Sequence, residues 1–445
     1  MDENTYLNPE TEPAKAGPEP EPAAEEPAPE HPAPEAEQTK RKAKKSGSSR
    51  GIAVFAAILG AVILCGITFF ATYTLTNQLH EAETAEWKTR LARFSKLEAF
   101  LDAIESSYAG DADESELMDA AYHALFSELD DYSCYMTREE YGEFSSSRTG
   151  YAGIGVSVTL DPETEGMYIY RVIPGSPAEK AGLKTGMIIV GVEDIEVDRT
   201  TYRDAVNAVG GDEGTPVALK IRDGENTRSV SVVRGHVESK SVWYTDLGNG
   251  LSLIEIDEFT ASKTADQFRE ALEQAVSDGS RGIIFDVRGN PGGDLNVITS
   301  VLDMLLPEGP IVNIVVNGEV QRTISSGAAQ TVTLPMAVLC DGGTASAAEL
   351  FTADLRDYEL ATIVGETTFG KGTVQTVTRF RDGSAYKMTT SLYTPACGEG
   401  YNGVGIAPDV EASLPDGTNV NRFLLSREED LPLQEAIKIL LGGQS

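Results

Sequence analysis

One apolar stretch limits what the rest of this chain can become. It runs from Gly51 to Leu75 without a charged residue, and a helix of about 20 apolar residues is long enough to cross a bilayer. Six basic residues between Lys40 and Arg50 lie directly before it, so the positive-inside rule places that flank in the cytoplasm. A cleaved signal peptide is the alternative, but its basic region would lie at the very start of the chain and its apolar core would be shorter. The sequence therefore predicts a membrane helix here, with the bulk of the chain outside the cytoplasmic membrane.

The residues before this stretch have the composition of a disordered tail. The first 38 are rich in Pro, Glu and Ala, and such a segment buries too little apolar surface to offset the entropy lost when its backbone is ordered. We therefore expect residues 1–50 to be an acidic cytoplasmic tail that ends in the basic flank.

The chain beyond residue 50 is strongly acidic. Residues 1–50 contain 11 acidic and seven basic residues, which leaves 59 of the 70 acids and 29 of the 36 bases beyond them, a net charge of about −30. A surface this negative repels phosphate backbones and argues against a nucleic-acid partner. Of the four cysteines, Cys65 lies in the apolar stretch, and Cys134, Cys340 and Cys397 lack metal-ligand spacing. We therefore expect no disulfide framework, no metal site and no cofactor.

The stretch from Thr331 to Lys371 holds the candidate chemistry. An apolar strand ending at Cys340 enters the turn D-G-G, and a helix is expected to start near Ala345. Ser346 would lie in the first turn of that helix, where backbone N–H groups have no helical partner and the helix dipole favours negative charge. A second apolar run then leads into the glycine-flanked turn that ends at Lys371.

The histidines decide which base is available to Ser346. The four are His31, His80, His123 and His236, so none follows the serine. A serine at a helix start is by itself more often a cap, and a lysine in a loop is usually solvated. A Ser-Lys pair, however, needs no residue from elsewhere in the chain. To act as a base, Lys371 must lose about 3 pKa units through burial, and the apolar neighbours Phe369 and Val374 are expected to supply it.

Two elements of this stretch resemble a known family. They are G-T-A-S-A-A-E-L, residues 343–350, and G-E-T-T-F-G-K-G-T-V-Q, residues 365–375, and they are similar to motifs of the carboxyl-terminal processing peptidases, or tail-specific proteases. The resemblance implies that Ser346 is the nucleophile, Lys371 the base and Gln375 the residue that orients the lysine. Thr344 and Leu350 stand where the family often has serine and isoleucine. The resemblance extends over about residues 97–414.

A third element lies between a predicted strand and helix. R-G-N-P-G-G-D-L, residues 288–295, contains neither a G-x-G-x-x-G pattern nor a P-loop lysine, so no nucleotide partner is expected. It is similar to a loop of the same family, and the resemblance implies an oxyanion hole made by the amide of Ala347 and that of Gly292 or Gly293. The sequence does not choose between the two glycines.

The residues from Tyr151 onward predict a separate binding module. Short alternating strands, turns and a helix follow one another, in an order that looks like a PDZ domain. The loop G-I-G-V, formed by Gly153, Ile154, Gly155 and Val156, matches the carboxylate-binding loop of such domains. There, successive N–H groups hold a chain terminus and an extended peptide pairs beside a strand. Ile154 and Val156 are expected to line an apolar pocket.

Apolar residues at helical spacing precede this module. They are Leu91, Phe94, Leu97, Leu101 and Ile104, and they predict a stalk helix that packs on its own domain or forms the seam of a homodimer or higher oligomer. After Ser239 strands and helices alternate, with one helix expected over Thr264–Ser277, another over 297–306 and a last one over Leu433–Leu441.

These segments define the expected architecture, an α/β (α+β) fold. The resemblance implies a PDZ domain placed before or within a serine protease domain of the crotonase/ClpP-like ββα kind. The expected segments are the tail 1–50, the transmembrane helix 51–75, a helical region 81–148, the PDZ domain 149–236, the protease domain 237–415 and a C-terminal helical segment 416–445.

The predicted function is that of a membrane-anchored serine endopeptidase. The resemblance implies protein or peptide substrates, exported or misfolded, whose free apolar C-termini bind the PDZ domain. If that domain must be occupied before Lys371 is aligned, the free enzyme is latent. A catalytically silent PDZ scaffold that binds C-termini is the alternative, although it would not need Ser346, Lys371 and Gln375 together. An ATP-dependent protease is disfavoured because no nucleotide motif is present.

Overall fold

The computed structural model describes residues 49–146, 151–260, 263–327, 332–414 and 422–442. The predicted acidic tail lies outside the described residues as far as residue 48. The described residues divide into two units between Ala103 and Ile104, and each is considered on its own.

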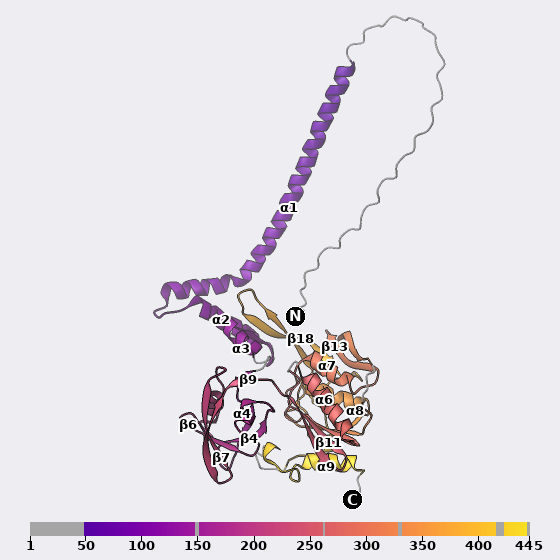
Figure 1. The fold of residues 1–445 in the computed structure, drawn as a ribbon. Helices are drawn as coiled ribbons and strands as arrows, with labels where there is room; N and C mark the ends of the chain where they lie inside the picture. The colour runs from indigo at the N-terminus through magenta and orange to yellow at the C-terminus, as the bar shows by residue number, and fades with distance from the viewer. Residues whose placement is uncertain (1–48, 147–150, 261–262, 328–331, 415–421, 443–445) are drawn as a thin grey trace, which may run out of the picture. The chain divides into compact units, whose positions relative to one another are not determined.

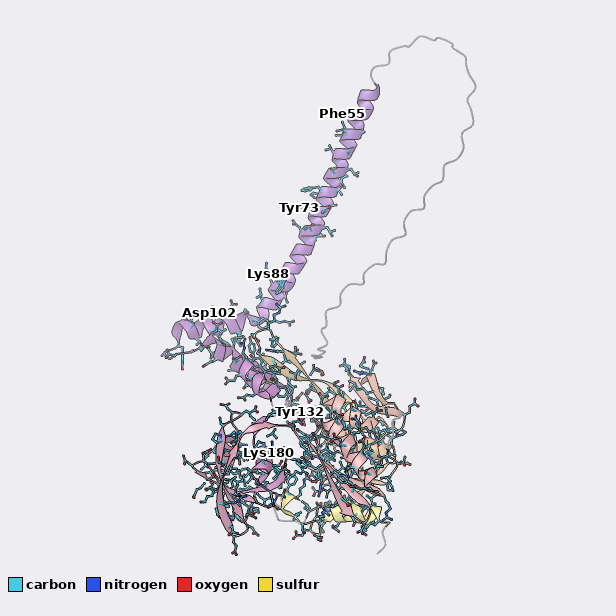
Figure 2. The ribbon with its side chains drawn as sticks, in the orientation of Figure 1. Phe55, Tyr73, Lys88, Asp102, Tyr132 and Lys180 are labelled. Carbon is cyan, nitrogen blue, oxygen red and sulfur yellow. The ribbon has the colours of Figure 1, made fainter. Side chains whose placement is uncertain are left out.

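The first unit is dominated by one long helix. Helix α1 spans Ser49–Ser107 and contains Ala57–Gln78, which is long and apolar enough to cross a membrane. Its apolar side chains, including Phe55 and Tyr73, are exposed (Figure 2). The sequence predicted a membrane helix followed by a separate stalk helix. The two are continuous because neither Gly nor Pro occurs between Thr76 and Ser107 to interrupt the helix.

The PDZ-like part of the second unit is built on a twisted antiparallel sheet in the order β3-β4-β5-β7-β8, with β6 paired to β5. Its core alternates along the strands, as in β4, where Met167 and Ile169 are fully buried and their neighbours are half-buried. Strand β3 lies at the edge of this sheet. The elements are β2 Tyr151–Gly153, β3 Val156–Leu160, β4 Met167–Val172, α4 Pro177–Lys180, β5 Ile188–Val192, β6 Ile195–Glu196, α5 Tyr202–Val209, β7 Pro216–Asp223, β8 Asn226–Val233 and β9 Gly235–Val237.

A six-stranded sheet forms the centre of the second unit, in the order β10-β11-β12-β15-β16-β19. Strands β11, β12, β15, β16 and β19 are parallel to one another, and β10 is antiparallel to β11. The elements are β10 Val242–Gly248, β11 Leu251–Ile256, α6 Thr264–Ser277, β12 Gly282–Asp286, α7 Leu295–Asp303, β15 Met336–Cys340, α8 Ala347–Asp357, β16 Ala361–Gly365, β19 Val410–Glu411, η1 Arg422–Leu424 and α9 Leu431–Leu440.

Both faces of this central sheet are covered, which explains its continuous apolar strands. Ile283 and Phe285 of β12 point into the core shared with α6, α7 and α8, whereas Ile284 between them packs with Leu433 and Ala436 of α9. Figure 1 shows α9, in yellow, apart from α6 and α8. The carboxyl ends of β12 and β15 therefore lie side by side, and each leads into a glycine-containing turn.

A third sheet brings distant segments together, in the order β1-β18-β13-β14 with β17 paired to β18. Its strands are β1 Cys134–Met136, β13 Gly309–Val316, β14 Glu319–Ser326, β17 Thr373–Arg379 and β18 Ala385–Thr394. Strand β1 follows α2, Glu114–Ser127, and precedes α3, Arg138–Ser146. Cys134 pairs with Lys387 on β18, so the residues just before β1 lie beside β18. Strand β18 also pairs with β17, which follows the turn that contains Lys371.

The predicted helices differ from the observed ones only at their ends. The helix expected over 264–277 is α6 with the same bounds. Helix α7 begins two residues earlier than expected because Asp294 caps it through the N–H of Asn296. Helix α9 also begins two residues early, since the side chain of Asp430 accepts from the N–H of Leu433.

Candidate active site

Ser346 occupies the turn between β15 and α8 in an unusual backbone conformation. Its φ is 56° and its ψ −117°, a region that residues other than glycine rarely adopt and that costs about 1–3 kcal/mol. The helix consequently starts at Ala347, and not near Ala345 as the sequence predicted, with Ser346 as its N-cap. The turn projects the half-buried serine at the carboxyl end of the sheet.

Glu349 holds this turn and the lysine turn together. Its side chain is fully buried. One carboxylate oxygen, Oε2, accepts hydrogen bonds from the N–H of Ser346 at 2.8 Å and from that of Lys371 at 2.7 Å. The other, Oε1, accepts from the hydroxyl of Thr368 at 2.6 Å and from the N–H of Gly370 at 2.7 Å. One carboxylate thus fixes the backbone on both sides of the candidate site.

The sequence offered a signal for this role that our motif analysis did not use. Ser346 and Glu349 have the S-x-x-E spacing of a capping box, in which the glutamate reaches back to the N-cap N–H. That spacing predicts the bond to Ser346. It carries no information about Lys371, which reaches the same oxygen only through the fold.

The two candidate oxyanion glycines differ in how their N–H groups are used. The N–H of Gly292 donates to the side chain of Asn290 at 2.8 Å, and its φ of 100° places it directly against the nucleophile turn. A Cβ on Gly292 would lie 2.7 Å from the Cβ of Ser346. Gly293 is exposed, and within the described residues neither its N–H nor that of Ala347 has a hydrogen-bond acceptor.

Gly293 is nevertheless restricted from its other side. It packs against the backbone of Phe259, and a Cβ on Gly293 would lie 2.3 Å from the carbonyl carbon of Phe259. Gly292 also accepts from the N–H of Phe259 at 2.8 Å, while Asp294 donates to the carbonyl of Phe259 at 3.0 Å. The loop between β12 and α7 is therefore fixed before any ligand arrives.

Lys371 is half-buried in the turn between β16 and β17. Burial, helped by the positive charge of Lys387, lowers its pKa, while the carboxylates of Asp130 and Glu349 act in the opposite direction. Its Nζ lies 4.0 Å from the centre of the Tyr132 ring. Among the described residues, Nζ forms no hydrogen bond with Ser346.

The apolar neighbours expected for Lys371 were only partly correct. Val374 is half-buried, but Phe369 is 56% exposed and so cannot shield the lysine from water. The main chain explains this, because the N–H of Phe369 donates to the carbonyl of Thr344 at 3.0 Å while its side chain turns outward. Tyr132, which no sequence argument had singled out for this purpose, contacts the amine instead.

Gln375 lies in β17, the strand that follows the turn of Lys371. Its side-chain amide donates to the hydroxyls of Thr373 at 2.9 Å and Thr389 at 3.2 Å. In the part of the chain that the structure describes, it forms no hydrogen bond with Lys371. The predicted orienting role therefore stays a prediction.

Two buried tyrosines also border the candidate site. Tyr393 donates its hydroxyl to the carbonyl of Lys371 at 3.0 Å, and its N–H bonds the carbonyl of Gly372 at 3.0 Å. The hydroxyl of Tyr401 lies 3.5 Å from the carbonyl of Ser346. Burial raises the pKa of Tyr393, partly offset by hydrogen bonds with Tyr401 and with the Ser346 side chain. No sequence motif had indicated either tyrosine.

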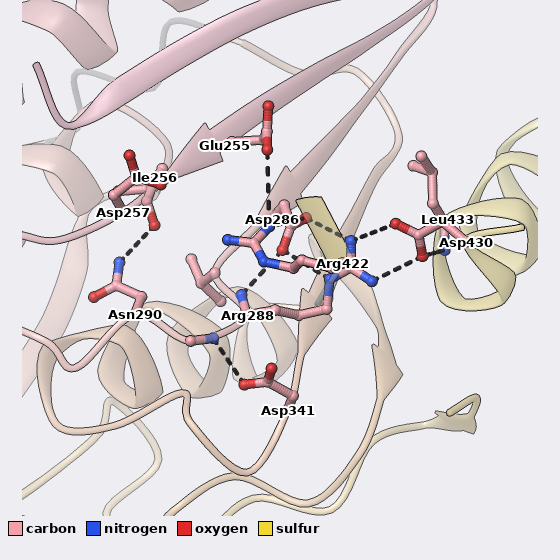
Figure 3. A network of polar contacts seen from close by, with 12 residues as sticks. Glu255, Ile256, Asp257, Asp286, Arg288, Asn290, Asp341, Arg422, Asp430 and Leu433 are labelled. Carbon is pink, nitrogen blue, oxygen red and sulfur yellow. Dashed lines mark hydrogen bonds and ion pairs between the residues drawn. The ribbon is translucent and has the colours of Figure 1, made fainter. Parts of the chain in front are cut away.

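A buried ion-pair network supports the loop that carries the glycines (Figure 3). Arg288 pairs with Asp286 at 2.7 Å and with Asp430 at 2.8 Å, and Arg422 pairs with Asp286 at 3.0 Å. Burial alone would raise the pKa of Asp286, but Arg288 and Arg422 lower it to about 2. Next to this network, Asp341 accepts from the N–H of Gly289 at 2.8 Å, which ties the nucleophile turn to the same loop.

The predicted peptide-binding loop lies between β2 and β3. Gly153 is buried and Gly155 has a φ of 80°. A Cβ on Gly155 would lie 2.4 Å from that of Ser176, so only glycine fits. Within the described residues, the N–H groups of Ile154 and Gly155 have no acceptor, whereas their carbonyls accept from Ala178 and Ile173.

The side chains of this loop are less available than expected. Ile154 is 1% exposed and belongs to the core of the PDZ-like part, while Val156 is half-buried and packs against that core. Ile154 therefore forms the floor beneath the loop and is not an open pocket wall. The loop offers a ligand mainly its backbone.

The PDZ-like part contacts the central sheet through Arg171 of β4. Its guanidinium lies 2.7 Å from Glu255 and 2.5 Å from Asp257, at the end of β11. Trp243 donates to Asp257 at 2.9 Å and stacks with the same guanidinium, 4.7 Å from its ring centre. Arg171 is 8% exposed, so this contact is shielded from solvent.

Comparison with known proteins identifies the class. The model of peptidase family S41 matches residues 250–412, and a PDZ domain model matches residues 168–223. The chain is 33% identical over 369 residues to the carboxy-terminal processing protease CtpA of Bacillus subtilis (strain 168), covering 81% of this chain and 77% of that protein. It is 30% identical to a protein of Staphylococcus aureus (strain MSSA476) named "Probable CtpA-like serine protease", covering 82% and 73%.

A solved structure agrees on the fold. A protein described as an S41 protease of Bacteroides fragilis NCTC 9343 matches with a TM-score of 0.51 and 17% identity, covering 76% of this chain and 93% of that one. The family matches define a serine-type peptidase with a PDZ domain. The chain belongs to peptidase family S41, together with the carboxy-terminal processing proteases.

Proposed function

We propose that this protein is a membrane-anchored serine endopeptidase in which Ser346 is the nucleophile and Lys371 the general base. One observation supports this assignment above the others. The buried carboxylate of Glu349 accepts from the backbone N–H of both residues through a single oxygen. A structural cap would need only the bond to Ser346. The second bond brings the lysine turn to the serine, and the lowered pKa of Lys371 suits a base.

In the proposed reaction, neutral Lys371 takes the proton of the Ser346 hydroxyl as the oxygen attacks the scissile carbonyl. The tetrahedral oxyanion accepts hydrogen bonds from Ala347 and, as we infer, from Gly293, because the N–H of Gly292 is already engaged by Asn290. The C–N bond then breaks, and the leaving amine takes the proton from Lys371. Water hydrolyses the acyl-enzyme by the same proton transfers. Each oxyanion donor contributes about a factor of 10²–10³ to the rate in such sites.

The described conformation is one in which the reaction has not begun. The lysine amine lies over Tyr132 and the serine hydroxyl lies near Tyr393. A small rearrangement must therefore align the two groups, which is compatible with a latent free enzyme. Gln375 is proposed to orient the lysine after that rearrangement.

We propose that the substrates are proteins with free, apolar C-terminal tails. The N–H groups of Ile154 and Gly155 suit a terminal carboxylate, and β3, which lies at the edge of its sheet, directly follows them. An extended peptide can therefore pair with β3 while its carboxylate binds the loop. Gly153 and Val156 flank these donors and complete the proposed peptide site.

We also propose that α1 anchors the protein in a membrane with its N-terminus in the cytoplasm. The apolar length of Ala57–Gln78 and the basic flank before it support this. Protease added to intact cells should then degrade the region beyond α1 and leave an epitope within residues 1–38 intact. Loss of that epitope would contradict the orientation.

The activity is tested with the full chain in detergent micelles, compared with its Ser346→Ala and Lys371→Ala variants. The substrate is an unfolded protein that ends in apolar residues, and the same protein with an amidated C-terminus is the control. We expect both variants to lose at least about 10³-fold in kcat/KM, and amidation to slow cleavage by the parent.

Matched controls are the exposed Ser300→Ala and Lys438→Ala variants, which should cleave like the parent. Cleavage by Ser346→Ala at the parental rate would overturn the assignment of the nucleophile. Binding that depends on the free terminus, with no cleavage by any version, would favour a scaffold.

A further inference from the structure

The segment Asp130–Ser133 lies outside the peptidase region matched by the family model, yet it reaches the candidate base. Tyr132 precedes β1, and its ring lies 4.0 Å from Nζ of Lys371. Ser133, next to it, accepts a hydrogen bond from the N–H of Thr389 at 3.0 Å. Thr389 in turn accepts from the side chain of Gln375 at 3.2 Å. One short segment therefore contacts the surroundings of both Lys371 and Gln375.

The main chain is held in place both before and after Tyr132. Before it, Asp130 accepts hydrogen bonds from the N–H groups of Tyr132 and Ser133, each at 2.8 Å, which closes a tight turn. After it, β1 pairs with β18 from Cys134 onward. Tyr132 itself is half-buried. The fold therefore holds the main chain that carries this ring on both sides.

We propose that Tyr132 is a positioning residue for Lys371, whose ring covers the amine and excludes water from it. The proposal rests on the proposed function in so far as Lys371 is the base. The charged groups that face this amine are Lys387 on β18, Asp130 in the segment itself and Glu349 on α8. The ring is the apolar surface among them.

Two opposing effects of the ring decide the sign of the prediction. Its face attracts an ammonium group and so favours the charged lysine. Its bulk removes water from the amine and so favours the neutral lysine. Burial is the largest influence on Lys371 and it lowers the pKa, so we expect the second effect to dominate. Removing the ring should therefore raise the pH at which the lysine becomes neutral.

The test titrates Lys371 directly. The full chain carrying Ser346→Ala is labelled with limiting acetic anhydride at a series of pH values, and acetylation of Lys371 is measured by mass spectrometry, since only the neutral amine reacts. Adding Tyr132→Ala should raise the midpoint by about one pH unit, which is a roughly tenfold loss of neutral amine at pH 7. Greater access alone would raise the plateau of the labelling rate and not its midpoint.

Three further variants make the result decisive. Tyr132→Phe keeps the ring and should restore the parental midpoint. Tyr132→Leu keeps an apolar cover without a π face and should give a midpoint at or below the parental one. Tyr108→Ala, which removes a tyrosine that is 62% exposed, should change nothing. A midpoint that is unchanged or lowered by Tyr132→Ala, in a protein that melts like the parent, would overturn the proposal.

The readout does not depend on proteolysis. If Ser346→Ala cleaves substrate like the parent, the proposed function fails while the lysine titration still reports on Tyr132. If the protease activity is confirmed, the acidic limb of the pH profile of kcat/KM should move upward in Tyr132→Ala by the same amount as the labelling midpoint.

Discussion

The two ends of helix α8 bury carboxylates in opposite ways. Near its start, the two oxygens of Glu349 receive four donated hydrogen bonds. Near its end, Asp354 is equally buried but accepts one bond, from the N–H of Ala396 at 2.9 Å. Its other oxygen has no partner among the described residues.

Both carboxylates are buried, so the number of hydrogen-bond donors, and not burial, accounts for the difference between them. Burial raises the pKa of Asp354 well above its ordinary value because too little compensates for the lost water. At Glu349 the donors come from two turns that the chemistry must bring together. The carboxylate with four converging donors, Glu349, therefore lies at the candidate site. The carboxyl with an unsatisfied oxygen, Asp354, lies near the other end of the helix.

A third buried carboxylate extends the comparison and gives the largest expected effect. Asp286 is satisfied by guanidinium groups, chiefly that of Arg288, which also pairs with Asp430. Arg288→Met should lower the free energy of unfolding by about 3–5 kcal/mol, because it leaves two buried carboxylates without their main donor. Chemical unfolding followed by tryptophan fluorescence measures this change.

The matched control is Arg269→Met, which breaks the exposed pair with Asp266 and should cost less than about 1 kcal/mol. Equal losses in the two variants would show that the buried pairs of this network contribute no more than surface pairs.

Replacing Glu349 tests the four-donor arrangement itself. In Glu349→Gln, one oxygen becomes an NH₂ group that faces donors, so two buried donors lose their acceptor. We expect a loss of about 2–4 kcal/mol in unfolding free energy, together with a fall in kcat where the protein is still folded. Thr352→Val on the same buried face of α8, whose hydroxyl bonds only the carbonyl of Ala348, is the control. Full activity in Glu349→Gln would separate this carboxylate from the candidate site.

Asp354→Asn should have the smallest effect of the three near pH 4, and its effect should grow as the pH rises. The folded-state pKa of Asp354 lies above the unfolded value, so its contribution to stability is complete below about pH 4 and is lost as the pH rises toward the folded pKa, by at most about 1.4 kcal/mol per pH unit. Asparagine removes this dependence. The variant should therefore gain stability relative to the parent between about pH 4 and 7.

Unfolding of parent and variant at several pH values measures the difference. Asp212→Asn, at an exposed position, controls for the loss of one acidic residue. Parallel pH dependences of parent and Asp354→Asn would mean that the unpaired carboxyl is charged in the folded protein.

Local signals predicted most of the fold and the two turns that meet at the candidate site. The apolar strands, the glycine turns around Ser346 and the periodicity of α6 all depend on neighbours in the chain, so the sequence contains them. The same is true of the continuation of the helix beyond Thr76, because residues 76–107 contain neither Gly nor Pro. Ser346 and Lys371 came from motifs, and their turns do lie together.

What could not be predicted depends on contacts between distant segments. Our proposal of Gly293 over Gly292 as an oxyanion donor rests on the side chain of Asn290, which accepts a hydrogen bond from the N–H of Gly292. The cover over Lys371 comes from Tyr132, far earlier in the chain, and not from the adjacent Phe369. Neither hydrophobic periodicity nor motif spacing predicts which distant segments come into contact in the folded protein.

The position of Glu349 has a consequence for the order in which this enzyme matures. Its four hydrogen bonds form only when α8 has packed against the central sheet and the turn after β16 has closed over it. Completion of the core and alignment of the serine and lysine turns are therefore one step. If Ser346 is the nucleophile, as we propose, a partly folded copy has no aligned nucleophile, and the chain would acquire its activity last and spare neighbouring copies that are still folding.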